Sequence, residues 1–180
     1  ETIWRFTSGL GIPNIMGNGF SWDHNIGIPF LAGSSIKGTV RAWVEQWNQD
    51  FPEILESSKQ IFGDEQTGIG DTIFFDAFPN HVPTLQIDII NVHYKDYYDK
   101  KLNSENKPIP PADYLSPVPV FFLTVQPKTS FSFAIAPRSK SNENNQLLDK
   151  SEKFLREALT IIGSGSKTAI GYGHFSAMDL

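Results

Sequence analysis

The first residues of the chain alternate between apolar and polar side chains. Residues 2–10 read TIWRFTSGL, and this period of two is typical of a strand with one buried face. Residues 11–28 are rich in glycine and predict a loop. Apolar residues then recur at helical spacing, at Ile36, Val40, Trp43, Val44 and Trp47. The pattern predicts a helix that begins at Ser34 or Ser35 as the N-cap and ends near Pro52.

Short strand-like segments fill the middle of the chain. Residues 71–78 (DTIFFDAF) and 85–90 (LQIDII) are predicted strands joined by the turn PNHVP. Residues 91–117 are polar, irregular and rich in proline, and they are too long for a simple connector. We interpret them as an insertion that is either functional or partly disordered. Residues 118–126 and 130–136 are predicted to form a hairpin around PKT.

The last third of the chain predicts one helix and one strand. After a polar loop at residues 139–150, an amphipathic helix is expected over residues 147–162, and a final strand over residues 172–178. With the additional strands taken as insertions, the order is βαββαβ. The sequence therefore predicts one α+β domain over residues 1–180. Its fold would be ferredoxin-like (RRM-like), an antiparallel sheet with two helices on one face and inserted hairpins and loops, with the irregular insertion at about 91–117.

Composition limits the classes of function. The 180 residues carry a formal net charge of -5, so a role in nucleic-acid binding must depend on a local basic patch. The absence of cysteine excludes disulfides and thiolate metal sites, and no apolar run approaches the length of a membrane span. We therefore expect a cytoplasmic protein with no membrane partner. Because the chain opens at Glu1 without a methionine, we also expect that residues before it were removed.

A glycine-rich segment near the C-terminus, GSGSKTAIGYGHF (residues 163–175), suggests an anion site. It is not a P-loop, because Ile161 and Ser166 occupy the positions of the two required glycines. It is not a dinucleotide fingerprint, because Thr168 replaces the third glycine. Backbone N–H groups of such a loop can form an anion-binding nest, and Lys167 adds a charge. The alternative is a tight connection in which the glycines only relieve steric crowding.

A second basic segment, GSSIKGTVR (residues 33–41), begins the first predicted helix. Lys37 and Arg41 are one helical turn apart and lie beside two serines at the helix N-terminus. A pair of this kind is more often a solvated helix face. In the predicted fold, however, both basic segments neighbour the central strands, so we expect them to line two sides of one groove. Gly38 is costly inside a helix, which hints that something approaches the helix closely there.

Together these segments resemble the RAMP superfamily of CRISPR-associated proteins. The late loop GSGSKTAIGYG and the helix start GIPFLAGSSIKGTVRAW carry the resemblance, although Ala32 stands where the family usually has proline. NGFSWDH, IFGDEQTGIGDTIFFDAFP and IDIINVHYKDYY further resemble a subunit of the type III-B (Cmr) effector complex. The resemblance covers the chain from about Arg5 to Phe175.

The resemblance implies a non-catalytic RNA-binding subunit without a cofactor. Such a subunit holds the 3′ part of the guide RNA (crRNA) and its target RNA and packs against neighbouring RAMP subunits, in antiviral defence. The positions that match the family's motifs are Ser34, Ser35, Lys37, Arg41, Gly163, Gly165, Lys167, Thr168, Gly171, Tyr172 and Gly173. The three cations would neutralise phosphates, while hydroxyls and loop amides would bond phosphate or 2′-OH groups. Tyr172 would stack on a base if it is exposed, but a core tyrosine is the favoured interpretation.

Two other functions stay open from the sequence. The superfamily includes endoribonucleases, and Asp23 and His24 lie in the loop where an acid or base would act in them. Their ordinary roles are a turn cap and a packed histidine. The other alternative is a subunit that contacts only protein. His93 and its aromatic neighbours suit a contact surface for RNA or for a partner, and no histidine or carboxylate pattern predicts a metal.

Overall fold

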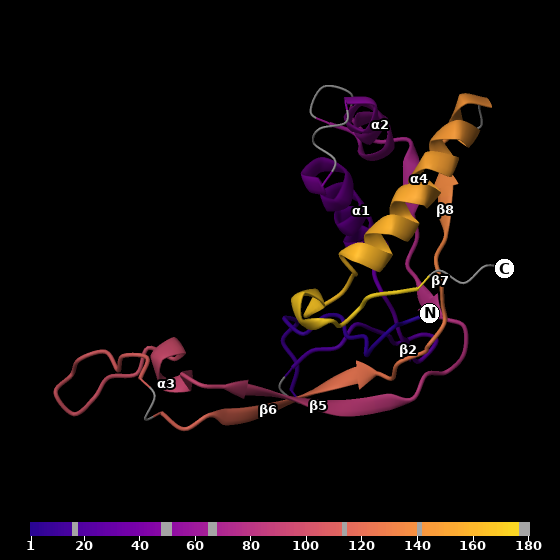
Figure 1. The fold of residues 1–180 in the computed structure, drawn as a ribbon. Helices are drawn as coiled ribbons and strands as arrows, with labels where there is room; N and C mark the ends of the chain where they lie inside the picture. Colours follow the sequence, from indigo (N-terminus) through magenta and orange to yellow (C-terminus); the bar gives the residue numbers. More distant parts are fainter. Residues whose placement is uncertain (16–17, 48–51, 65–67, 113–114, 140–141, 177–180) are drawn as a thin grey trace.

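The fold combines helices with short antiparallel strand pairs, which confirms the α+β class (Figure 1). The computed structural model of the chain describes residues 1–15, 18–47, 52–64, 68–112, 115–139 and 142–176. Within these residues no helix has the length and apolar character needed to cross a bilayer.

Three helices pack together at one end of the molecule (Figure 1). They are α1 (Gly33–Trp47), α2 (Pro52–Phe62) and α4 (Asn142–Ile161). The apolar stripe predicted for α1 is confirmed, since Val40 and Val44 are fully buried against a core that includes Ile61 and Ala158. The sequence analysis missed α2, because Pro52 was interpreted as a stop. Proline is also favoured at the first position of a helix, where its missing N–H costs nothing.

One strand pairing differs from the prediction. The pairs are β1 (Trp22–Asp23) with β2 (Ile28–Pro29), β3 (Thr72–Phe74) with β8 (Ile135–Pro137), β4 (Phe78–Pro79) with β7 (Phe131–Ser132), and β5 (Leu85–Val92) with β6 (Val118–Val125). The expected hairpin of residues 118–126 with residues 130–136 is therefore wrong. The PKT segment does not reverse the chain, because Lys128 and Thr129 form backbone hydrogen bonds to Thr2. Residues 118–137 instead run antiparallel to residues 72–92.

The β5–β6 hairpin and the residues that it carries at its far end form an arm, residues 85–125, that projects from the rest of the molecule (Figure 1). Near the tip lies the short helix α3 (Lys95–Tyr98), so the irregular segment predicted at 91–117 is the end of this hairpin. One face of the arm is apolar and open to solvent. Its members are 40% to 67% exposed, and they are Ile87, Ile89, Phe121 and Leu123.

The two terminal segments lie side by side without forming regular strands in the part of the chain that the structure describes. Thr2 bridges to Phe175, and Phe6 bridges to Val125 at the root of the arm. The expected strand over residues 2–10 is thus reduced to isolated bridges. The expected strand over 172–178 is replaced, as far as residue 176, by turns, because Gly171 and Gly173 take positive φ. Residues 177 and 178 lie outside the described residues.

Candidate functional site

Groups of the protein itself occupy the N-terminus of α1. A Cβ at Gly33 would lie 2.3 Å from the carbonyl oxygen of Phe74, so this crossing requires glycine. The Gly33 N–H donates to the carboxylate of Asp76 at 2.7 Å, and the Ser35 N–H donates to the Ala32 carbonyl. A carboxylate already lies at the positive end of the helix, where the sequence had suggested a phosphate. Donors for an anion would have to lie further along α1.

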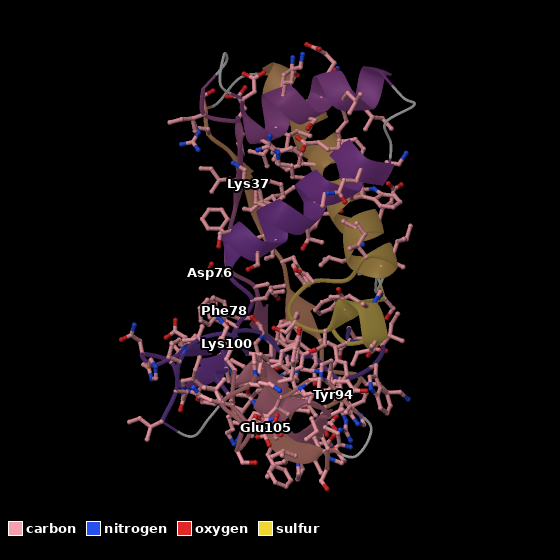
Figure 2. The ribbon with its side chains drawn as sticks, turned by 90° about the vertical axis from the view of Figure 1, so that its left-hand side faces the viewer. Lys37, Asp76, Phe78, Tyr94, Lys100 and Glu105 are labelled. Carbon is pink, nitrogen blue, oxygen red and sulfur yellow. The ribbon has the colours of Figure 1, made fainter. Side chains whose placement is uncertain are left out.

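Four residues of α1 form a cationic stripe: Ser34, Lys37, Gly38 and Arg41. At about 100° per residue they fall within one sector of the helix. Ser34 and Gly38 are exposed, and a Cβ at Gly38 would meet nothing, so none of the described residues makes the close approach expected there. Arg41 is half exposed and pairs with Glu45 at 2.7 Å. Lys37 donates from Nζ to the Phe62 carbonyl at 3.1 Å, and Figure 2 shows it on the side of α1 away from α4.

A third cation lies near the stripe, at the end of β8. Arg138 donates from Nε to the Gly70 carbonyl at 2.9 Å. Burial lowers the pKa of Lys37, and the positive charges of Arg41 and Arg138 lower it further. Sequence reasoning missed Arg138, because it belongs to neither basic motif and comes near the stripe through the pairing of β8 with β3.

The glycine-rich loop, residues 163–173, is mostly occupied by contacts within the protein. Added Cβ atoms would lie 2.8 Å from the Gly173 carbonyl oxygen at Gly163, 2.6 Å from the Thr7 carbonyl oxygen at Gly165, and 2.1 Å from the Ser164 carbonyl oxygen at Gly173. Each of these glycines also has positive φ, which fits the alternative of steric relief.

The loop amides also have partners. Backbone hydrogen bonds to carbonyl oxygens of the chain use the N–H groups of Gly163, Ser164, Ser166, Ile170, Gly171, Tyr172 and Gly173. A nest of free donors would have to come from the few remaining amides. Gly171 is the one of the four motif glycines whose Cβ would meet open space.

Lys167 and Tyr172 attach the loop to the arm. The Lys167 ammonium lies 5.3 Å from the centre of the Phe122 ring. Tyr172 is 8% exposed and donates its hydroxyl to Asp88, which also pairs with Arg5. Burial, followed by the hydrogen bond to Asp88, raises the pKa of Tyr172 to about 12. The condition for base stacking, an exposed ring, is not met.

Asp88 carries the negative charge of this cluster. Burial acts to raise the pKa of its carboxyl, but three donors outweigh burial, so that the pKa is lowered. These donors are the Tyr172 hydroxyl, the Ile89 N–H and Arg5. A charged carboxylate therefore links the N-terminal segment, the arm and the glycine-rich loop.

The two basic segments meet in space, but their cations point to different neighbours. Thr39 of α1 and Ser164 of the loop share a hydrogen bond of 3.0 Å between their hydroxyls. Residues 37 and 39 lie about 200° apart around a helix, so the side of α1 that contacts the loop is not the side that carries Lys37. Lys37 donates to the Phe62 carbonyl and Arg41 pairs with Glu45, whereas Lys167 lies over Phe122 of the arm.

Asp23 and His24 occupy a small hairpin turn between β1 and β2. The Asp23 carboxylate accepts the N–H groups of Asn25 at 2.8 Å and of Ile26 at 3.1 Å. This is an Asx turn, the ordinary structural role of aspartate in a loop. His24 is exposed. Among the described residues no hydrogen bond joins the two side chains.

Comparisons with known proteins agree with the motifs. A family model described as "RAMP superfamily" matches residues 9–176. The CRISPR system Cmr subunit Cmr6 of Pyrococcus furiosus is 37% identical over 230 aligned positions, which cover 96% of this chain and 65% of that protein. Cmr6 of Saccharolobus solfataricus is 28% identical, over 97% of this chain and 56% of that protein. The chain thus spans between half and two thirds of the length of these relatives.

Solved structures give the same assignment. A chain in the cryo-EM structure of the type III-B Cmr-beta complex bound to cognate target RNA has a TM-score of 0.71 and 26% identity, and the match covers 99% of this chain and 56% of that one. The crystal structure of Cmr6 from Pyrococcus furiosus has a TM-score of 0.61 and 27% identity, with coverage of 99% and 94%. Sequence, family model and fold agree: the chain belongs to the RAMP superfamily of CRISPR-associated proteins.

Proposed function

We propose that this protein is a non-catalytic, RNA-binding subunit of a cytoplasmic type III-B RNA-guided effector complex that serves antiviral defence. The similarity to Cmr6 supports membership of such a complex. In the proposed role the chain holds the 3′ part of the guide RNA together with its target.

The observation that carries RNA binding is the open cationic stripe on α1. Lys37 and Arg41 lie one turn apart around Gly38, where nothing in the described part of the chain covers the helix backbone. A sugar-phosphate strand can approach that surface closely while the two cations neutralise its phosphates. The exposed Ser34 hydroxyl adds a donor and acceptor suited to a phosphate or a 2′-OH group.

The glycine-rich loop has a smaller direct part in this proposal. Gly165 is exposed, and Lys167, Thr168 and Gly171 are half-buried, so these positions can reach RNA. Gly163, Tyr172 and Gly173 are buried, and we assign to them the support of the loop rather than contact.

The apolar face of the arm supports a second contact, with a neighbouring RAMP subunit. Ile87 pairs across the hairpin with Leu123, and Ile89 pairs with Phe121, so four large apolar side chains form one exposed patch. Patches of this kind mark protein-binding surfaces. A role in protein contact therefore accompanies RNA binding rather than replacing it.

We also propose that the strands follow the ferredoxin-like order predicted from the sequence. Backbone hydrogen bonds join residue 174 to Ile3 and Phe6 to Val125, and the latter segment runs beside β5. This neighbour order supports a βαββαβ arrangement with two terminal strands that are only partly formed.

The test is RNA binding by the purified chain and its variants, measured by fluorescence anisotropy with labelled oligouridine at several salt concentrations. Each lost phosphate contact lowers the salt slope for a single strand by about 0.7, which corresponds to roughly fivefold in affinity near 0.1 M salt. We expect the Lys37→Ala/Arg41→Ala variant to lose about 25-fold. We expect Lys167→Ala to lose less than about twofold, because its ammonium lies over Phe122.

Lys59→Ala is the matched control, because Lys59 is an exposed lysine of α2 in a weak pair with Glu56. Unchanged thermal unfolding shows that the variants fold. If the double variant binds RNA as tightly as the unchanged protein, the stripe is not the RNA site and the proposal is wrong.

A further inference from the structure

We propose that Arg138 is a third phosphate contact, so that an RNA strand on the cationic stripe continues toward Phe62, Gly70 and the end of β8. This inference rests on the proposed function, since it extends the site on α1. It adds two points to that function. The RNA strand runs away from the glycine-rich loop, and one of its phosphate contacts lies outside both sequence motifs.

The first argument is how the two side chains are held. Lys37 donates to the Phe62 carbonyl at 3.1 Å, and Arg138 donates to the Gly70 carbonyl at 2.9 Å. These carbonyls belong to backbone segments in close contact, because a Cβ at Gly70 would lie 2.4 Å from the Phe62 carbonyl carbon and 2.6 Å from the Gly63 nitrogen. The two cations are thus anchored on backbone segments that lie in direct contact, the end of α2 and the loop before β3.

The second argument is the donors that remain. Guanidinium has five N–H donors, and the bond to Gly70 uses only the one on Nε. Lys37 keeps two of its three. In the part of the chain that the structure describes, neither side chain forms an ion pair with a carboxylate. The planar fork of Arg138 is suited to bind a phosphate through two parallel hydrogen bonds.

The third argument is the concentration of positive charge. Burial lowers the pKa of Lys37, and the charges of Arg41 and Arg138 lower it further, so the three cations lie close enough to interact. Like charges held together repel one another, and a bound anion removes that repulsion. Glu45, the carboxylate that pairs with Arg41, also accepts a hydrogen bond from Ser58. A polyanion is the ligand that fits three neighbouring cations.

The experiment compares Arg138→Gln with Arg156→Gln in the full chain, using labelled oligouridine as the probe. Glutamine keeps an N–H donor for the Gly70 carbonyl while it removes the charge. Arg156 is the control, because it is an exposed arginine of α4 paired with Glu152 at 2.8 Å. We expect Arg138→Gln to weaken binding roughly fivefold and to lower the salt slope by about 0.7, and Arg156→Gln to change neither.

The outcomes separate this inference from the proposed function. If Arg138→Gln binds like the unchanged protein while Lys37→Ala/Arg41→Ala loses affinity, Arg138 is not a contact and the strand takes another direction. If none of the variants loses affinity, the site on α1 itself is wrong. Should Arg138→Gln fold poorly, photocrosslinking of 4-thiouridine RNA to the unchanged protein decides. Crosslinks in residues 62–71 or 135–139 support the inference, and crosslinks confined to 163–173 overturn it.

Discussion

The cationic stripe and the glycine-rich loop are built from similar residues but use them in opposite ways. Both combine glycine, serine and lysine in about ten positions. On α1 the glycine faces open space, Arg41 is half exposed, and Lys37 is anchored to the Phe62 carbonyl. In the loop, three of the four motif glycines meet backbone atoms, and the lysine covers an aromatic ring. The difference shows that composition alone does not distinguish an open cationic surface from a packed loop.

The largest expected effect is a loss of stability when a glycine of the glycine-rich loop is replaced. In Gly173→Ala the new Cβ would lie 2.1 Å from the Ser164 carbonyl oxygen at a φ of 66°. Left-handed strain of about 1–2 kcal/mol adds to overpacking of about 1–3 kcal/mol. We therefore expect the free energy of unfolding to fall by about 2–5 kcal/mol in urea titrations. A variant as stable as the unchanged protein would mean that the loop is not packed as described.

The next effect concerns the attachment of the loop to the arm. Tyr172 has its pKa raised to about 12 by burial and by Asp88. In an ultraviolet absorbance titration we expect one of the five tyrosines to ionise near that value. In Asp88→Asn that transition moves toward 10, the ordinary value, because the carboxylate charge is gone.

The same pair gives the chain a stability that depends on pH. The folded pKa of Tyr172 is raised, so its contribution is complete below pH 10 and is lost as the pH rises toward 12. The folded pKa of Asp88 is lowered, so its contribution is complete above its usual value of 3.8 and is lost as the pH falls through the folded value. Tyr172→Phe should lack the alkaline loss, and retention of that loss would assign it to another group.

The smallest expected effect is a gain in stability rather than a loss. Gly38→Ala adds a Cβ into open space within α1. Because glycine is less favourable than alanine inside a helix by about 0.8–1.0 kcal/mol, we expect a gain of about that size in the free energy of unfolding. If the variant is destabilised instead, Gly38 has a neighbour and the stripe is not open.

Sequence reasoning found what depends on local pattern. The spacing of Ile36, Val40 and Val44 predicted α1, because helix amphipathicity follows from one segment alone. It missed α2, since proline both ends helices and begins them. It also mispaired residues 118–126, because the partner of a strand depends on contacts distant in the sequence.

For the candidate site, too, the sequence predicted the local features but not those that depend on long-range contacts. The motif positions on α1 were identified from the sequence, and the geometry gives them an open surface. The convergence of Lys167 with Lys37 was expected from the fold and is not what the side chains do, because the position of Lys167 in the left-handed region turns it toward Phe122. Arg138 left no signal, since its place near α1 depends on how β8 pairs with β3.

The apolar face of the arm has a practical consequence for handling the protein. A two-stranded hairpin with an exposed apolar face associates readily with copies of itself. We expect the chain to express at low yield alone and to elute as oligomers at high concentration. It should become monodisperse when it is co-expressed with the neighbouring RAMP subunit proposed to cover Ile87, Ile89, Phe121 and Leu123.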